Sequence, residues 1–261
     1  MSLSDQDRED LRHAKRLLEN PSLAVKITDI IGTPLEKGFE LLPAKWSDVV
    51  STATRKALQA ALDLAIATMD SSGPMPASNV LHKIIVGTSG TVAGAFGLAA
   101  LPIELPFSTT VMLRSIADVA RSQGEDLKSV NSKLACIEVF ALGGRSSADN
   151  AADLGYFAVR AALARAVSEA GQYIAERGLA QEAAPAIVRL ITQIGTRFGV
   201  TVSEKVAAQA VPLLGAAGGA IVNLVFIDHF QDMARGHFVV RRLERVHHPQ
   251  IVEAEYQKLT V

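Results

Sequence analysis

The sequence predicts an all-α protein, a multi-helix bundle with two central glycine-rich apolar helices. Hydrophobic residues make up 49% of its 261 residues but aromatic residues only 5%, a composition dominated by small and aliphatic side chains that helices accept. Apolar residues recur at helical spacing, whereas alternating strand patterns are absent apart from the weak candidate GVTVS at 199–203. Two long uncharged stretches account for the two central apolar helices of this prediction.

The first helices can be placed from their end signals. Ser4 precedes an acidic first turn and Asn20-Pro21 ends the helix that follows. Thr33-Pro34-Leu35-Glu36 resembles a capping box, with proline at the first helical position. Between Trp46 and Met69 the apolar positions repeat every three or four residues, which predicts an amphipathic helix.

The segment DSSGPMPAS at 70–78 has two prolines, a glycine and three serines, so it reads as a loop. We therefore expect residues 1–70 to form an N-terminal helical extension packed on a helical body, 78–261, within one structural domain.

In the body, helices are expected from about Pro106 to Gln123, ended by Gly124, and over 129–142, stopped by Gly143-Gly144. An alanine-rich helix should lie within 146–178. Pro185 should start another helix, and Ser203 is expected to cap the helix that leads into the second uncharged stretch.

The two uncharged stretches, 84–103 and 206–227, are each as long as a membrane span but contain glycine, proline and polar residues. The glycines of the first stretch are spaced by three, four and three residues, so they share one helical stripe, and the second stretch contains a GxxxG pair. Such stripes let two helix backbones approach closely. Two core helices of a soluble bundle, reversible membrane insertion and a two-span protein are all compatible with this pattern. The seam glycines are Gly87, Gly90, Gly94, Gly97, Gly215 and Gly219.

Charge and cysteine content narrow the function classes. The net charge is −1 with 26 basic and 27 acidic residues, so no nucleic-acid partner is expected. The single Cys136 lies in an apolar run and is expected to be a buried, unreactive thiol. The charged N-terminal residues lack the apolar core of a signal peptide, which favours a cytoplasmic location.

Three blocks of the sequence resemble the EcsC protein family. They are LPIELPFSTTVMLRSIADVARSQGEDL (101–127), CIEVFALGG (136–144) and VPLLGAAGGAIVNLVFIDHFQDMARGHFVVRRLE (211–244). The likeness covers about residues 20–246. It implies a helical bacterial protein associated with membrane or envelope processes, and it carries no catalytic motif over to this chain.

No phosphate-binding loop, dinucleotide fingerprint, HExxH or CxxC motif is present, and no cofactor or metal is predicted. The alternative function is a hydrolase, with or without a metal, built on Asp228, His229 and Asp232, because Asp228 and Asp232 share a helix face. The possible polar site around it also includes Arg114, Asp118 and Asn223. The simpler reading makes Arg114 and Asp118 a helix-face ion pair and Asn223 a hydrogen-bond partner of a neighbouring helix.

The segment ARGHFVVRRLERVHH (234–248) concentrates positive charge after the second apolar stretch. Its arginines, Arg235, Arg241, Arg242 and Arg245, are expected to contact anionic lipid head groups, and the alternative is a solvated helix end. The leading expectation is therefore a non-enzymatic protein, peripherally attached to a membrane, that binds membrane lipid or a membrane protein. A homo-oligomer is possible.

Overall fold

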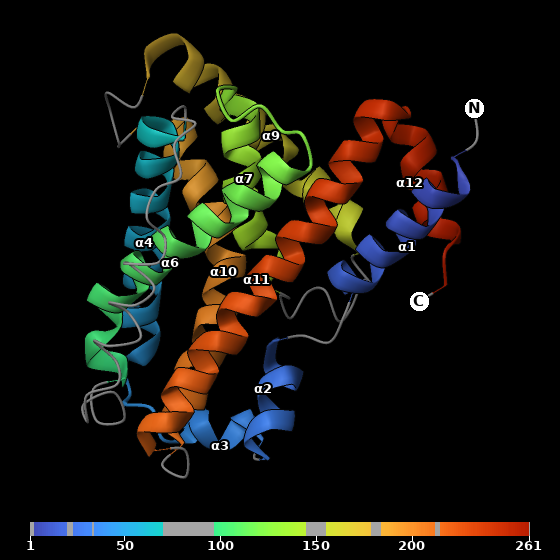
Figure 1. The fold of residues 1–261 in the computed structure, drawn as a ribbon. Helices are drawn as coiled ribbons and strands as arrows, with labels where there is room; N and C mark the ends of the chain where they lie inside the picture. Colours follow the sequence, from blue (N-terminus) through green and yellow to red (C-terminus); the bar gives the residue numbers. More distant parts are fainter. Residues whose placement is uncertain are drawn as a thin grey trace.

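The computed structural model describes residues 3–19, 23–32, 34–69, 97–144, 155–178, 184–211 and 215–260. These residues form ten α-helices and no strand, which confirms the predicted all-α bundle (Figure 1). The helices are α1 (Asp5–Glu19), α2 (Leu23–Ile31), α3 (Leu35–Glu40), α4 (Trp46–Thr68), α6 (Gly97–Ser122), α7 (Val130–Leu142), α9 (Tyr156–Arg177), α10 (Pro185–Ala210), α11 (Gly215–Val246) and α12 (Pro249–Lys258).

The long helix α11 crosses the molecule from the lower to the upper end of Figure 1 and contacts α1, α2, α6, α7, α10 and α12. Four phenylalanines join it to α7 and α10 in the middle of the core: Phe140, Phe198, Phe226 and Phe230. The ring centroid of Phe140 lies 5.1 Å from that of Phe198 and 5.5 Å from that of Phe230. Both distances are within the range of favourable aromatic pairs. This aromatic contact fixes how the three helices are placed relative to one another.

Alanines allow α4 to approach α6 and α10 closely. Ala53, Ala57, Ala61 and Ala65 recur every fourth residue and are completely buried, so one narrow face of α4 can press against its neighbours. The observed helix, Trp46–Thr68, matches the amphipathic helix expected from the sequence.

The N-terminal helix α1 packs against α11 and α12. The Lys15 ammonium donates hydrogen bonds to the carbonyl oxygens of Tyr256 (3.1 Å) and Leu259 (2.8 Å), at the C-terminal end of α12. A cation there satisfies carbonyls that lack helical partners and complements the helix dipole. Both ends of the described chain therefore meet on one side of the bundle (Figure 1).

Most helix ends agree with their sequence signals. The Asp7 amide donates to Ser4 Oγ over 3.1 Å at the start of α1. Pro185 begins α10, and α9 ends before Gly178, whose φ is +64°. The expected loop at 70–78 lies outside the described residues.

Three expectations about helix ends were wrong. Pro34 is the N-cap of α3 and not its first helical residue, and no side chain of the described residues caps that helix. Helix α6 begins at Gly97, before rather than at Pro106, and it contains both Pro102 and Pro106. Pro106 deprives the carbonyl of Pro102 of its usual donor, but Pro102 is exposed, so water can replace that donor. Ser203 does not cap a helix, because it lies inside α10 and its hydroxyl donates to the Gly199 carbonyl (2.7 Å).

The second uncharged stretch is also divided. Residues 206–210 end α10, whereas 215–227 begin α11. The first stretch enters the described residues only at Gly97. No helix within the described ranges combines the length and apolar character of a transmembrane span.

The predicted glycine seam falls mostly outside this description. Gly87, Gly90 and Gly94 are not among the described residues, while Gly97 and Gly215 are the first residues of α6 and α11 and Gly219 follows one turn into α11. Helices α6 and α11 do pack together, and Gln231 Nε2 donates to Ser115 Oγ over 2.9 Å. The glycine seam itself stays a prediction.

Candidate functional site

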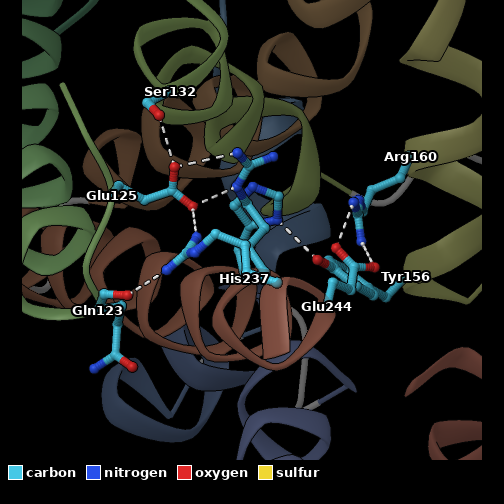
Figure 2. A network of polar contacts seen from close by, with 9 residues as sticks. Gln123, Glu125, Ser132, Tyr156, Arg160, His237 and Glu244 are labelled. Atoms are coloured by element: carbon cyan, nitrogen blue, oxygen red, sulfur yellow. Dashed lines mark hydrogen bonds and ion pairs between the residues drawn. The ribbon is translucent and has the colours of Figure 1, made fainter. Parts of the chain in front are cut away.

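A buried network of polar side chains joins the end of α6 to α7, α9 and α11 (Figure 2). Its first member is positioned by the C-terminal turn of α6. The Glu125 amide donates to the Ala120 carbonyl (3.0 Å) and the Gly124 amide to the Arg121 carbonyl (2.9 Å), the two bonds of a Schellman motif. Gly124 has a φ of +79°, a conformation that suits glycine best. The turn points the chain back and places Glu125 against α11.

The Glu125 carboxylate pairs with two arginines of α11 and accepts a hydrogen bond from a hydroxyl of α7. Arg241 donates two hydrogen bonds to its carboxylate, at 2.9 and 3.2 Å, Ser132 Oγ donates at 2.7 Å, and Arg245 forms a further ion pair. Burial alone would raise the pKa of Glu125. The hydrogen bonds from Arg241 and Ser132 and the charges of Arg241 and Arg245 outweigh it and hold that pKa below its usual value. Glu125 is therefore a charged carboxylate inside the protein.

A second ion pair connects α9 to α11. Arg160 forms a two-pronged pair with Glu244, at 2.7 and 3.0 Å, the geometry in which guanidinium and carboxylate bind most specifically.

Beside this pair, a hydrogen bond of 2.8 Å joins Tyr156 Oη and His237 Nδ1. Burial, followed by the charges of Arg160 and Arg241, lowers the pKa of His237 well below its ordinary value. His237 is thus neutral at physiological pH, and its buried Nε2 atom has no hydrogen-bond partner in the described ranges.

Glu138 of α7 is the remaining buried acid of this region. No hydrogen bond to its carboxylate is found in the described part of the chain, and burial raises its pKa although Arg160 and Arg241 act in the opposite direction. The network as a whole ties four elements together through paired charges. Its chemistry is that of a structural polar core, in which the buried His237 Nε2 has no hydrogen-bond partner among the described residues.

We call the four arginines of 234–248 the arginine tract, and all four form ion pairs with carboxylates of the protein. Arg241 and Arg245 both pair with Glu125, Arg242 pairs with Asp10 of α1, and Arg235 pairs with Asp232 one turn before it on α11 (2.9 Å). A lipid phosphate would have to compete with these three carboxylates, all of which are at least partly buried. The head-group contact therefore stays a prediction, and the carboxylates of the protein compete with the lipid phosphate for these arginines.

The residues of the possible polar site do not converge. His229 is buried, and a hydrogen bond of 2.8 Å joins its Nε2 to the Gly143 carbonyl at the end of α7. Asp232 instead faces Lys26 of α2 (3.2 Å), and Asp228 is exposed. No group of three or more His, Cys, Asp or Glu side chains in the described ranges is arranged to hold a metal ion.

Two further members of that predicted site, Asp118 and Asn223, have partners outside it. Asp118 pairs with Arg121 (2.6 Å) and not with Arg114, so the predicted helix-face pair was wrong in its partner. Three-residue spacing brings Asp118 and Arg121 together as readily as four-residue spacing would. Asn223 accepts a long hydrogen bond, 3.5 Å, from Gln209 of α10, as the simpler reading expected. Cys136 is buried and its pKa is raised by burial, which agrees with an unreactive thiol.

A different feature stands out at the lower end of the bundle in Figure 1. Helices α6 and α11 begin there, and α2 and α3 lie beside them. Large apolar side chains are exposed on these elements, and we name them together the apolar end: Ile30, Leu41, Ile103, Phe107, Ile221 and Leu224. Ile103 is 80% exposed and Leu224 54%. Scattered single apolar residues are ordinary on a surface, but a gathering at one end indicates an interaction site.

Sequence reasoning missed the carboxylate that organises the arginines. Arg241 and Arg245 are four residues apart on α11 and so share one face, which signalled a common partner. Nothing in the local sequence identified that partner as Glu125, more than a hundred residues earlier.

The structure defines a class of protein: an all-α bundle without a transmembrane helix in its described part, built around a polar network on a long C-terminal helix. The chain belongs to the EcsC protein family, whose family model matches residues 5–243. The chain has no significant match among curated proteins or among solved structures.

Proposed function

We propose that this protein binds the surface of a lipid bilayer through the apolar end, without catalytic activity. The observation that carries the proposal is the exposure of Ile103, Phe107, Ile221 and Leu224 within about the first three turns of α6 and α11. The sequence that leads into these helices, 84–96 and 212–214, is also free of charge. Several apolar side chains at one end of a rigid bundle can enter the interfacial layer of a membrane together.

The charges around the apolar end favour insertion over electrostatic attraction. The exposed charged residues of α2, α3 and the start of α4 comprise four acids, Asp29, Glu36, Glu40 and Asp48, against two bases, Lys37 and Lys45. Lys205 and Glu104 neutralise each other across α10 and α6 at 2.6 Å. Binding through this end should therefore depend little on anionic lipid.

The arginine tract lies too far along α11 to share this contact in an upright orientation. Arg241 follows Ile221 by 20 residues, which corresponds to about 30 Å along a helix. A contact through Arg241 would require the molecule to lie flat and to release Glu125. The apolar end requires neither change, so it is the better-supported contact.

The test is vesicle sedimentation with neutral and with anionic vesicles. The double variant Ile103→Ser/Phe107→Ser should bind about 10- to 100-fold more weakly, which corresponds to the loss of roughly 1.4–2.8 kcal/mol of transfer free energy. Both side chains are exposed in the native state, so folding should be nearly unaffected.

The matched control is Val188→Ser/Val246→Ser, which removes two exposed apolar side chains from other parts of the surface. It should bind as wild type does. Wild type that binds neither kind of vesicle would overturn the proposal, as would equal losses in the two double variants. Wild-type binding that requires anionic lipid and disappears in added salt would instead favour the arginine tract.

The proposal keeps the expected location, a peripheral protein on the cytoplasmic face of a membrane. A membrane protein as partner, and a homo-oligomer, remain compatible with the same exposed surface. No arrangement among the described residues favours the hydrolase alternative, because Asp228, His229 and Asp232 face three different surroundings.

A further inference from the structure

A groove runs between α4 and α10, and none of its lining residues belongs to the apolar end or to the polar network. It encloses about 340 Å³, within the range of small-molecule sites. Trp46 of α4 and Ser203 of α10 line it together with Arg55 and Thr192. The two helices run antiparallel along the groove, and Gly195 of α10 lies against Leu58 of α4.

The groove is open because α10 has glycines where side chains would fill it. Gly195 and Gly199 are one turn apart, and a Cβ atom at Gly199 would meet no atom within 4 Å. Buried Val50, Thr54 and Ile191 also line the groove. Two glycines inside a helix cost stability, and here they leave a hollow with an apolar lining.

One buried polar group in this lining has no partner among the described residues. Thr54 is 2% exposed, yet its hydroxyl makes no hydrogen bond within that part of the chain. A threonine in a helix commonly bonds to a carbonyl of the preceding turn, and an unpaired buried hydroxyl is costly. A ligand in the groove that accepts or donates a hydrogen bond would remove that cost.

The two walls of the groove differ in the polar groups that they present to a ligand. On α10 the hydroxyls of Thr192, Thr196 and Ser203 donate to carbonyls of their own helix, at 2.7, 3.0 and 2.7 Å. On α4, Ser47, Ser51 and Arg55 recur every fourth residue along the rim, and Arg55 has no ion-pair partner in the described ranges. The α4 wall therefore supplies donors and a positive charge, which suits an anionic group.

We propose that the groove binds a single-chain amphiphile with an anionic head group, such as a medium-chain carboxylate or alkyl phosphate. The head group pairs with Arg55, and the chain runs along Val50 and Val200 towards Trp46. Nine residues separate Trp46 from Arg55, about 13 Å along the helix, so the site takes an extended chain rather than a compact anion. This proposal does not depend on bilayer binding.

Trp46 is the chain's one tryptophan and lies at the far end of the groove, so its fluorescence reports occupancy. Decanoate and decyl phosphate, titrated below their micelle concentrations, should change the emission saturably. Calorimetry on the same samples provides a readout independent of the tryptophan. Decanol, which lacks the charge, and inorganic phosphate, which lacks the chain, should both bind at least about tenfold more weakly.

Two variants with one control test the assigned residues. Arg55→Ala should weaken decanoate binding about tenfold or more and leave decanol binding unchanged. Lys56→Ala removes the neighbouring exposed cation, which does not line the groove, and should bind as wild type. Gly199→Leu fills the hollow and should abolish binding of both ligands, with circular dichroism and thermal unfolding confirming the fold.

Further outcomes separate this site from the apolar end. Ile103→Ser/Phe107→Ser should retain decanoate binding, and Gly199→Leu should retain vesicle binding. Decanoate binding by Gly199→Leu at wild-type affinity would overturn the proposal. So would equal affinities of the Arg55→Ala and Lys56→Ala variants, or no calorimetric signal for wild type.

Discussion

Tyr156 Oη and His237 Nδ1 lie 2.8 Å apart, between α9 and α11, with both side chains buried. The hydrogen bond joins residues 81 positions apart. Within the part of the chain that the structure describes, His237 Nε2 has no hydrogen-bond partner, and Arg160 and Arg241 lie in the same region. The pair therefore makes the fold sensitive to protonation of a single imidazole.

The first prediction is acid destabilisation through His237. Its folded pKa is lowered well below 6.5 by burial and by the two arginines, so the unfolded chain binds the proton more readily. Stability should fall as the pH drops below about 6.5. We expect His237→Gln to show a flatter decline between about pH 7.5 and pH 5 in urea unfolding. Parallel curves for the two proteins would contradict the prediction.

The second prediction concerns the ion pairs of Glu125. Removing its charge with Glu125→Gln leaves Arg241 and Arg245 without their carboxylate, and breaking such a buried pair typically costs about 3–5 kcal/mol. Glu125 is held below its usual pKa against the effect of burial, so the wild type should lose this contribution as the pH falls through the folded pKa.

Arg241→Met serves as the matching change on α11. A double variant that cost as much as the sum of the two single variants would show that the residues are not coupled. Urea unfolding at neutral pH measures all three.

The third prediction is a stabilising substitution at Glu138. Burial raises its pKa, so the folded state favours the protonated acid. Its contribution is most favourable below the unfolded pKa near 4.5 and declines as the pH rises through the folded pKa. Glu138→Gln, which keeps shape without charge, should raise the melting temperature at neutral pH and change it little near about pH 4. A lower melting temperature at neutral pH would show that Glu138 is needed as an anion.

The fourth prediction uses the glycines that contact α10. A Cβ atom at Gly38 would overlap the Ala207 carbonyl, and one at Gly144 would overlap the Arg197 carbonyl. Backbone cannot yield as a flexible side chain does, so Gly38→Ala and Gly144→Ala should each cost about 1–3 kcal/mol or more. Gly199→Ala, where a Cβ meets nothing, should be neutral or slightly stabilising because alanine has the better helix propensity. Thermal unfolding of the three variants tests this prediction. Equal changes in stability would contradict the close approach of Gly38 and Gly144 to the backbone of α10.

Local sequence signals determined the helical elements well. The spacing of Ala53, Ala57 and Ala61 foretold the buried face of α4, and Gly124 foretold the end of α6. These signals work because helix periodicity and end geometry depend on residues within a few turns of one another. They failed at Ser203, where a hydroxyl bonds back to its own helix, and at Pro106, which α6 accommodates beside an exposed turn.

The partners of the charged residues were decided by the tertiary structure alone. The sequence marked Arg241 and Arg245 as a basic tract, but only the packing of α6 and α7 against α11 brings Glu125 to them, 116 and 120 residues away. The same holds for Trp46 and Gly199, which lie in one groove because α4 packs against α10. Helix formation depends on neighbours in the chain, whereas the pairing of a buried charge or the opening of a groove depends on which helix faces meet, and that is set by the whole core at once.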